Sequence, residues 1–227
     1  MLNIDHRGFV AEDRCGLMAH KTKRSHVDMR AEAIDTAYAI VAEEGVAALT
    51  IRRLAEAIDC SVGTIYNLFV DFDDLELHLA ARVVAEMGER LFAEPLPPDP
   101  SDRLRAIAAR YIAFAFARPR LWSMLFDYRS TSVRPPPDWH QQAIADLVAA
   151  AVAHASDAFS GDSDEVKDLI DVLWASVHGI AALGLSEKLG FVTAASAPAL
   201  ADKLVLTVLA GARGVAQPME RPRVIRL

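Results

Sequence analysis

The apolar residues of the chain recur at helical spacing, and no segment shows the sustained two-residue alternation of a strand. In the first such segment, steps of four, three, four and three positions separate Val27, Ala31, Ile34, Tyr38 and Val41. This spacing predicts a helix that buries the face formed by these five residues. Gly45 follows two glutamates and is expected to end the helix, because glycine is common at a helix C-cap.

Two short helices and one long helix are expected next, each after a residue whose side chain can cap a helix. Thr50 precedes the first short helix and Ser61 precedes the second. Asp59 lies in the tight turn between them, since aspartate tolerates the left-handed backbone that such turns require. Asp71 caps the long helix, which the prolines at positions 95–100 are expected to end.

Five further helices are expected beyond these prolines. Their periodic segments lie at about 102–117, 119–129, 138–159, 163–189 and 197–213. Pro119 suits a helix start, and the prolines at 135–137 separate two helices. The expected fold class is therefore all-α, with a small helical bundle followed by a larger one.

Composition favours a soluble protein of the cytoplasm. The chain has 227 residues, of which 52% are hydrophobic, and only two of them are cysteines, so it is no disulfide scaffold. Charged residues interrupt the N-terminal segment, which is therefore no signal peptide. The longest apolar stretch, Val172 to Leu185, is shorter than the roughly 20 residues that a membrane span needs. We therefore expect no membrane partner.

Positive charge is concentrated in the first third of an otherwise acidic chain. The formal net charge of −7 argues, taken alone, against a nucleic-acid partner. Lys21, Lys23 and Arg24 nevertheless precede the first helix, and Arg52 and Arg53 follow in the first short helix. A basic arm beside a helix-turn-helix could contact phosphates, although a solvated charged arm would have the same composition.

A helix, a tight turn and a second short helix form the geometry with which many proteins read DNA. The second helix enters the major groove while the first spans the backbone. Such helical hairpins also occur in proteins that never bind DNA, so geometry alone leaves a helical protein-binding adaptor as the alternative. A gel shift that weakens steeply with salt would favour the DNA reader over the adaptor.

The residues of this segment carry a specific resemblance. The run from Leu49 to Phe69, LTIRRLAEAIDCSVGTIYNLF, resembles the DNA-binding segment of the TetR family of transcriptional repressors. The shared features are a threonine before the first short helix, a Leu-Ala pair, and a Gly-Thr-Ile-Tyr-x-x-Phe sequence. Farther along, the run from Trp174 to Gly179 resembles the Trp-x-x-x-His-Gly sequence of one TetR subgroup.

The resemblance implies roles for individual residues. Phosphate contacts are implied for Thr50, Thr64 and Tyr66, with a further one from Arg52 or Arg53. Base edges would face Val62, Gly63 and Asn67, because an amide can pair with adenine and glycine allows a close approach. The DNA-binding residues expected in all are Lys21, Lys23, Arg24, Thr50, Arg52, Arg53, Ser61, Val62, Gly63, Thr64, Tyr66 and Asn67. Tyr66 could instead be a packing residue.

The chain departs from the family pattern at two positions. Leu68 stands where the family often has histidine or tyrosine, and Phe72 stands where it often has lysine. Both usual residues would grip the DNA backbone, so phosphate binding is expected to depend more on Lys21, Lys23 and Arg24.

The resemblance also implies a homodimer on a palindromic operator and a small-molecule effector, with no cofactor. It divides the chain into a flexible basic arm at 1–25, a DNA-binding domain at 26–72, a ligand-binding and dimerisation domain at 73–214 and a tail at 215–227. The aromatic content of the larger bundle predicts an apolar or aromatic effector. Its candidate pocket residues are Phe114, Phe116, Trp122, Met124, Phe126, Trp139, Trp174 and His178, each of which also fits an ordinary core position.

The last two helices are the candidate dimer interface. They combine apolar residues with glycines that seldom occur inside helices, because each costs about 1 kcal/mol relative to alanine. The expected interface residues are Gly179, Leu183, Gly184, Leu200, Leu204, Val208 and Gly211. Burial of both helices inside one subunit is the alternative.

An enzyme is not expected. The sequence has no glycine-rich phosphate loop, no cysteine pair at metal-binding spacing and no His-Glu-x-x-His helix. His140, His154 and His178 could converge from three helices, but their spacing does not require it. The sequence therefore predicts a DNA-binding regulator, expected to be a repressor that a small molecule releases, with no metal site.

Overall fold

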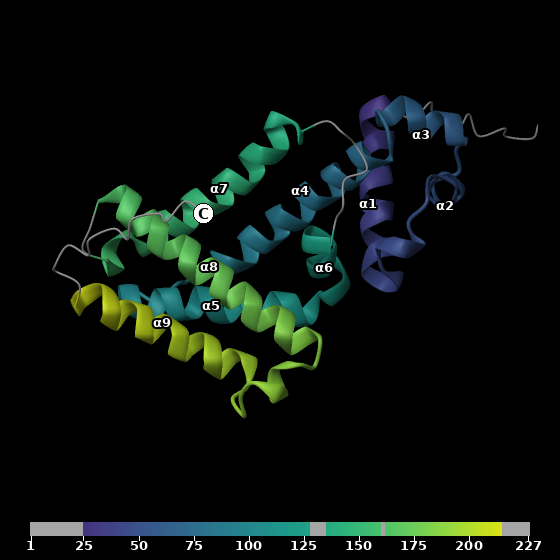
Figure 1. The fold of residues 1–227 in the computed structure, drawn as a ribbon. Helices are drawn as coiled ribbons and strands as arrows, with labels where there is room; N and C mark the ends of the chain where they lie inside the picture. Colours follow the sequence, from purple (N-terminus) through teal and green to yellow (C-terminus); the bar gives the residue numbers. More distant parts are fainter. Residues whose placement is uncertain (1–24, 128–134, 160–161, 215–227) are drawn as a thin grey trace, which may run out of the picture.

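The computed structural model describes residues 25–127, 135–159 and 162–214, and all regular structure in these ranges is helical (Figure 1). The α-helices are α1 (His26–Glu44), α2 (Ile51–Ala57), α3 (Val62–Leu68), α4 (Phe72–Leu91), α5 (Pro100–Ala117), α6 (Pro119–Asp127), α7 (Asp138–Ala155), α8 (Ser163–Leu185) and α9 (Ala197–Gly214). Three short 3-10 helices lie at Val46–Ala48, Ser156–Ala158 and Leu189–Phe191. The expected all-α fold is confirmed.

The helices of the small N-terminal bundle begin at the expected capping residues. The hydroxyl oxygen of Thr50 accepts a hydrogen bond of 3.2 Å from the backbone N–H of Arg53. Ser61 caps α3 in the same way, and a carboxylate oxygen of Asp71 caps α4. Asp59 adopts the left-handed backbone with φ 52°, so the sequence correctly predicted the turn between α2 and α3.

The buried face of α1 differs from the expected one. Ala33, Ala37, Ile40 and Val41 are buried, whereas Val27 is 76% exposed. Ala31, which was also expected inside, is exposed as well. Three of the five residues predicted by spacing do face inward, since Val41 is buried and Ile34 and Tyr38 are partly buried against the core. The packing of α1 on α4 and α6 buries Ala33, Ala37 and Ile40 beside them, in place of Val27 and Ala31.

Helix α4 joins the two bundles. Its N-terminal half packs on α1, and its C-terminal half runs between α5 and α7 (Figure 1). Leu75, Leu79, Val83 and Met87 are buried along it at helical spacing. A displacement of α4 in the larger bundle would therefore move residues that contact α1.

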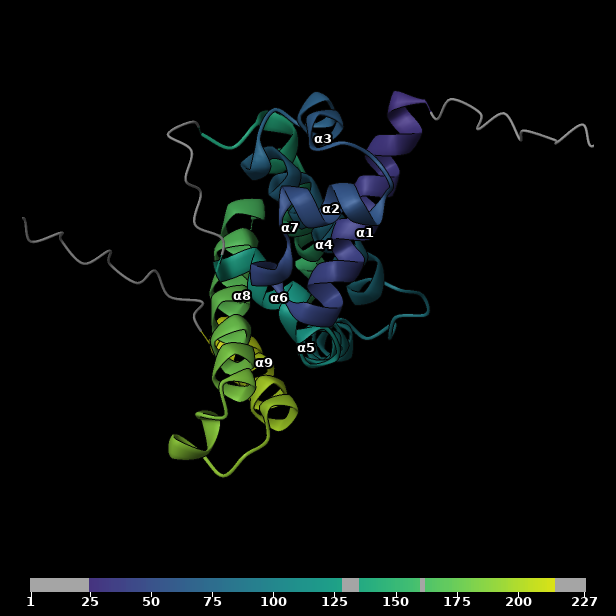
Figure 2. The ribbon, with the colours of Figure 1, turned by 90° about the vertical axis from the view of Figure 1, so that its right-hand side faces the viewer.

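The larger bundle has α5 near its centre, packed against α8 and α9 (Figures 1 and 2). By length and composition alone, residues 164–185 of α8 could cross a membrane, and only 22% of that apolar window is buried within the chain. The expectation of no such segment counted only the uninterrupted apolar stretch. Much of α8 thus presents apolar surface outward from a single subunit.

Two helices of this bundle end earlier than their periodicity predicted. Helix α7 ends at Ala155, and α8 ends at Leu185, each followed by a 3-10 helix. After α8, Glu187 has a φ of 57°, a conformation through which a right-handed helix does not continue. Phe159 and Leu189 are nevertheless buried, so the apolar pattern extends past both helix ends. Positions 128 and 129, expected in α6, lie outside the described residues.

Candidate nucleic-acid interface and ligand cavity

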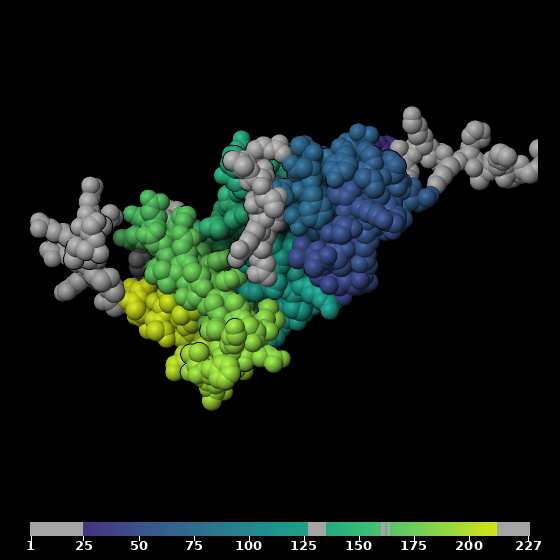
Figure 3. Space-filling model, turned by 45° about the vertical axis from the view of Figure 1, so that its right-hand side comes forward, coloured from purple at the N-terminus to yellow at the C-terminus, as the bar shows by residue number. Residues whose placement is uncertain are grey.

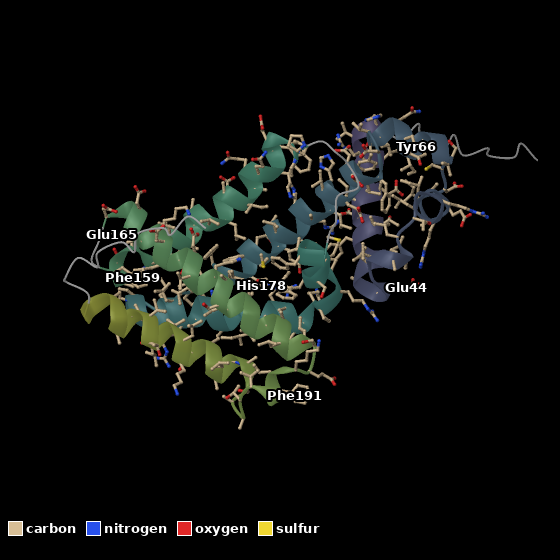
Figure 4. The ribbon with its side chains drawn as sticks, viewed as in Figure 1. Glu44, Tyr66, Phe159, Glu165, His178 and Phe191 are labelled. Atoms are coloured by element: carbon tan, nitrogen blue, oxygen red, sulfur yellow. The ribbon has the colours of Figure 1, made fainter. Side chains whose placement is uncertain are left out.

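Helix α3 exposes the face on which base-reading residues were predicted. Ile65 and Leu68 are buried on its inner side. On the outer side Tyr66 is 54% exposed and Asn67 is exposed beside it (Figure 4). Ser61, Val62 and Gly63 are exposed too, and Thr64 is partly buried with its hydroxyl 2.9 Å from that of Ser61. The structure therefore brings these predicted residues together on one surface.

The two arginines of α2 have different surroundings. Arg53 holds the carboxylate of Glu44 with two guanidinium nitrogens, one of them at 2.9 Å, and this hydrogen bonding lowers the pKa of Glu44. Arg52 pairs only with Glu56 one turn along α2, and its side chain is 84% exposed. Thr50 is exposed at the start of α2. Lys21, Lys23 and Arg24 lie outside the described residues.

The burial of Leu68 explains one departure from the family pattern. Its side chain is only 4% exposed, and Phe69 beside it is buried as well. Phe72 is partly buried and packs against the same core. These residues belong to the core against which the inner face of α3 packs, so only the outer face of α3 is available to DNA.

Ion pairs connect the small bundle to α4. Arg30 of α1 lies 3.7 Å from a carboxylate oxygen of Asp74 and also contacts the ring of His78. Arg82 pairs with Asp35 of α1. A carboxylate oxygen of Asp74 accepts the backbone N–H of Val70 at the end of α3. The position of α3 therefore depends on α4.

A cavity of about 160 Å³ lies between α4, α6, α7 and α8. Three predicted pocket residues, Met124, Phe126 and Trp174, line it. The other lining residues, which the sequence did not single out for this role, are Glu76, Leu77, Ala80, Val84, Met87, Leu125, His140, Ile144, Leu147 and Val148. Its wall is mainly apolar, which suits an apolar or aromatic molecule.

Tyr111, Trp122 and His178 form a hydrogen-bonded aromatic cluster that contacts Phe126. Tyr111 of α5 accepts a hydrogen bond of 3.1 Å from Nε1 of Trp122, and its hydroxyl lies 3.0 Å from Nδ1 of His178. The rings of Trp122 and Phe126 flank His178, which lies within the bundle (Figure 4). Burial lowers the pKa of His178 and raises that of Tyr111. Trp122 and His178 thus support the cavity wall through Phe126.

Phe114, Phe116 and Trp139, which were also predicted for the pocket, do not line this cavity. Phe114 is buried in the core, where it was needed for packing. Phe116 is 47% exposed on the outside of α5. The indole of Trp139 stacks on His78 with ring centroids 4.2 Å apart. These residues were selected for their aromatic character, which does not show which face of a helix points into a cavity.

Trp174 also borders a second and smaller cavity of about 60 Å³, whose lining includes Tyr111, Val177 and Val205. Its wall is almost wholly apolar. Trp174 therefore borders both cavities, and of the two only the larger one is lined by ionisable carboxyl and imidazole side chains, those of Glu76 and His140.

The candidate dimer residues lie on α8 and α9, at the end of the molecule away from α3 (Figure 3). Leu183, Leu200, Leu204 and Val208 are partly buried, and Val172 and Leu206 nearby are exposed. A Cβ at Gly179 or Gly211 would meet nothing within 4 Å. Gly184 differs, because a Cβ there would lie 2.7 Å from Phe116 of the same chain.

Two family models match most of the described chain. The model for bacterial regulatory proteins of the tetR family matches residues 33–75, and the model for the tetracyclin repressor-like C-terminal domain matches residues 104–208. The protein of Escherichia coli (strain K12) named "Probable acrEF/envCD operon repressor" is 26% identical over 201 residues, covering 83% of this chain and 90% of that protein.

Solved structures show the same fold. A protein of unknown function from Rhodococcus sp. RHA1 has a TM-score of 0.69 at 20% identity and covers 88% of this chain and 100% of its own. A tetR-family transcriptional regulator from Streptomyces coelicolor has a TM-score of 0.63 at 16% identity, covering 85% and 83%. At these identities the likeness concerns the fold alone.

Proposed function

Because the chain belongs to the TetR family of DNA-binding transcriptional regulators, we propose that it is a repressor that a small molecule releases from a palindromic operator. The observation that carries this proposal is the exposed outer face of α3, with Tyr66 and Asn67, above a buried inner face of Ile65 and Leu68. The chain would act by binding alone, in the cytoplasm, with no reaction of its own.

On DNA, α3 would lie in the major groove. Asn67 would read a base edge, while Tyr66, Thr64 and Arg52 would contact phosphates. Arg53 would take a structural role instead, because its guanidinium already holds Glu44. Lys21, Lys23 and Arg24 would add phosphate contacts from the arm.

The operator would be palindromic because two subunits read it together. Two α3 helices must lie about 34 Å apart to occupy successive major grooves. The apolar outer surface of α8 and the neighbouring face of α9 would join the subunits, which also accounts for a helix that is long and apolar yet little buried. The contacts between α8 and α9 of the two subunits would thereby set the distance between the two α3 helices.

The effector would occupy the cavity between α4, α6, α7 and α8. Its volume of about 160 Å³ is close to that of an engineered apolar cavity of about 150 Å³ that binds benzene. A molecule of about one ring would therefore fit. Such a ligand shifts the conformational equilibrium of the protein away from DNA binding only if it binds more tightly to the conformation that does not bind DNA.

Helix α4 would transmit this preference. Leu77, Ala80 and Val84 line the cavity, and Asp74 and Arg82 on the same helix pair with α1. A ligand that displaces α4 would therefore shift the small bundle and change the separation of the two α3 helices.

Sequencing of genomic fragments retained by the purified protein would test the proposal. We expect enrichment of a palindromic site, and a gel shift on that site that weakens steeply as salt rises. Retention of no particular sequence, with no salt-dependent band, would contradict it and favour a protein-binding adaptor.

A further inference from the structure

The larger cavity has two polar residues in a wall that is otherwise apolar. Glu76 comes from α4 and His140 from α7, while α6 and α8 contribute only Met124, Leu125, Phe126 and Trp174. Glu76 is adjacent in sequence to Leu77, whose backbone is hydrogen-bonded to His140. The two polar groups therefore lie at the same end of the cavity.

The carboxyl group of Glu76 has no cationic partner among the residues that the structure describes. Among the described residues, the charge that acts on it is the like charge of Asp73. Burial and this repulsion together raise the pKa of Glu76 to about 7. A half-buried carboxylate in apolar surroundings is unfavourable unless a cation or hydrogen-bond donors reach it.

His140 offers a hydrogen-bond acceptor at the same end. Burial lowers the pKa of the imidazole, which keeps it neutral, and a hydrogen bond to the backbone of Leu77 engages the ring. Nδ1 is buried and has no hydrogen-bond partner among the described residues. A neutral imidazole that donates from one nitrogen accepts at the other, so Nδ1 is available to a hydrogen-bond donor on a bound ligand.

We propose that this cavity takes a small organic cation, with an ammonium group bound by Glu76 and His140 and an apolar body of about one ring packed against Met87, Met124 and Trp174. The inference rests on the proposed function, since it assumes that the cavity is the effector site. An ammonium group supplies a positive charge, which the described residues do not offer to Glu76, and N–H donors for both acceptors. A neutral ring would satisfy only the apolar wall.

The test uses three probes that share one ring and differ in charge: benzylamine, benzyl alcohol and benzoate. Binding to the full chain is measured by calorimetry and by tryptophan fluorescence, to which Trp174 at the border of the cavity contributes. We expect benzylamine to bind at least about tenfold more tightly than benzyl alcohol at pH 8, and benzoate to bind most weakly.

Glu76→Gln keeps the shape of the side chain and removes its charge. This variant should weaken benzylamine binding by about tenfold or more while changing benzyl alcohol binding by less than about threefold. Glu89→Gln is the matched control, because Glu89 is exposed on the same helix and lies outside the cavity. The control should bind all three probes as the unmodified chain does.

The pH dependence gives a second readout. Benzylamine should bind the unmodified chain more tightly as pH rises from about 6 to about 8, since Glu76 ionises in this range. Among the described residues, Asp73 on α4 acts on Glu76 directly, His140 on α7 shares the cavity, and His78 on α4 interacts with His140. The wall residues that α6 and α8 contribute do not titrate. The Glu76→Gln variant should lose most of this rise.

Any of three results would overturn the inference. The unmodified chain binds benzylamine and benzyl alcohol with equal affinity, or Glu76→Gln retains the full preference for benzylamine over benzyl alcohol, or benzylamine does not bind at millimolar concentration. These outcomes are distinct from failure of the proposed function. A chain that binds its operator and is released by a neutral ring keeps the proposed function and loses the inference. A chain that binds benzylamine through Glu76 but never binds an operator keeps the cation site and loses the proposed function.

Discussion

The hydroxyl group of Tyr111 lies 3.0 Å from Nδ1 of His178 and thereby joins the centre of α5 to the centre of α8. The same oxygen accepts the indole N–H of Trp122 on α6. One buried hydroxyl therefore connects three helices of the larger bundle, two of which border the larger cavity.

Tyr111→Phe should lower the free energy of unfolding by about 1–3 kcal/mol, because it leaves the buried N–H of Trp122 without an acceptor. Urea unfolding followed by tryptophan fluorescence would measure the change. Tyr66→Phe is the control, since its hydroxyl is on the exposed face of α3 and its loss should leave stability unaltered. Equal stability of Tyr111→Phe and the unmodified chain would show that the hydrogen bonds contribute nothing.

Asn67→Ala should weaken binding to the operator by about 1–3 kcal/mol and leave affinity for random DNA nearly unchanged, because the amide would contact a base edge. Tyr66→Phe should instead weaken binding to both kinds of DNA, through the loss of a phosphate hydrogen bond. Titrations of operator and random duplexes at one salt concentration would measure both effects. An equal loss of affinity on both duplexes for Asn67→Ala would identify Asn67 as a backbone contact.

The two arginines of α2 should differ in their contribution to DNA binding. Arg52→Ala should reduce the salt slope of binding by about 0.9, as expected for one lost phosphate contact, because Arg52 is exposed and pairs only within its own helix. Arg53→Ala should change the slope little, since Glu44 already holds its guanidinium. The reverse order of effects would mean that DNA displaces Glu44 from Arg53.

The cavity carboxyl should make stability fall as pH rises. The pKa of Glu76 is about 7 in the folded chain, against roughly 4.3 for an unfolded glutamate, so the folded state binds the proton more tightly. The contribution of the Glu76 carboxyl to stability is fully present below its pKa in the unfolded chain. It is lost as the pH rises through its pKa in the folded chain. Glu76→Gln should therefore gain stability relative to the unmodified chain between about pH 4.5 and pH 8. Urea unfolding across this range should show no such trend for Glu89→Gln.

Local signals predicted the small bundle well because its features depend on neighbours in the sequence. Thr50, Ser61 and Asp71 each cap a helix three residues before their backbone partner, so the sequence alone identifies them. Helical spacing was less reliable for burial. It predicted that Val27 is buried, whereas Val27 is exposed and Ala33 and Ala37 are buried. The helices packed against α1 determine which of its adjacent faces is buried.

The cavity was harder to predict because its residues come from distant segments. Glu76 and His140 meet only when α4 packs on α7, and neither residue belongs to a motif. Tyr111 was also missed, although the Trp-x-x-x-His-Gly sequence led to its partner His178. Aromatic content alone could not separate Phe126, which lines the cavity, from Phe114, which fills the core.

The last prediction concerns the proposed dimer. Gly179 lies inside α8, where glycine costs about 1 kcal/mol relative to alanine, and a Cβ there would meet nothing within 4 Å in one subunit. A glycine that its own chain does not require is explained if a second subunit approaches the helix at this point. Gly184 is unsuitable for this test, because a Cβ there would lie 2.7 Å from the ring of Phe116 in the same chain, so the ring would have to shift even in a monomer.

Gly179→Leu should therefore fold with unchanged helical circular dichroism, sediment as a monomer and lose its affinity for a palindromic operator. Ala85→Leu adds apolar volume to an exposed position on α4 and should remain dimeric. Dimers of undiminished stability in Gly179→Leu would place the interface elsewhere. A loss of helical signal that persists as the protein concentration is raised would instead favour packing of α8 against its own chain at Gly179, because a fold that is lost only with the dimer is restored by mass action.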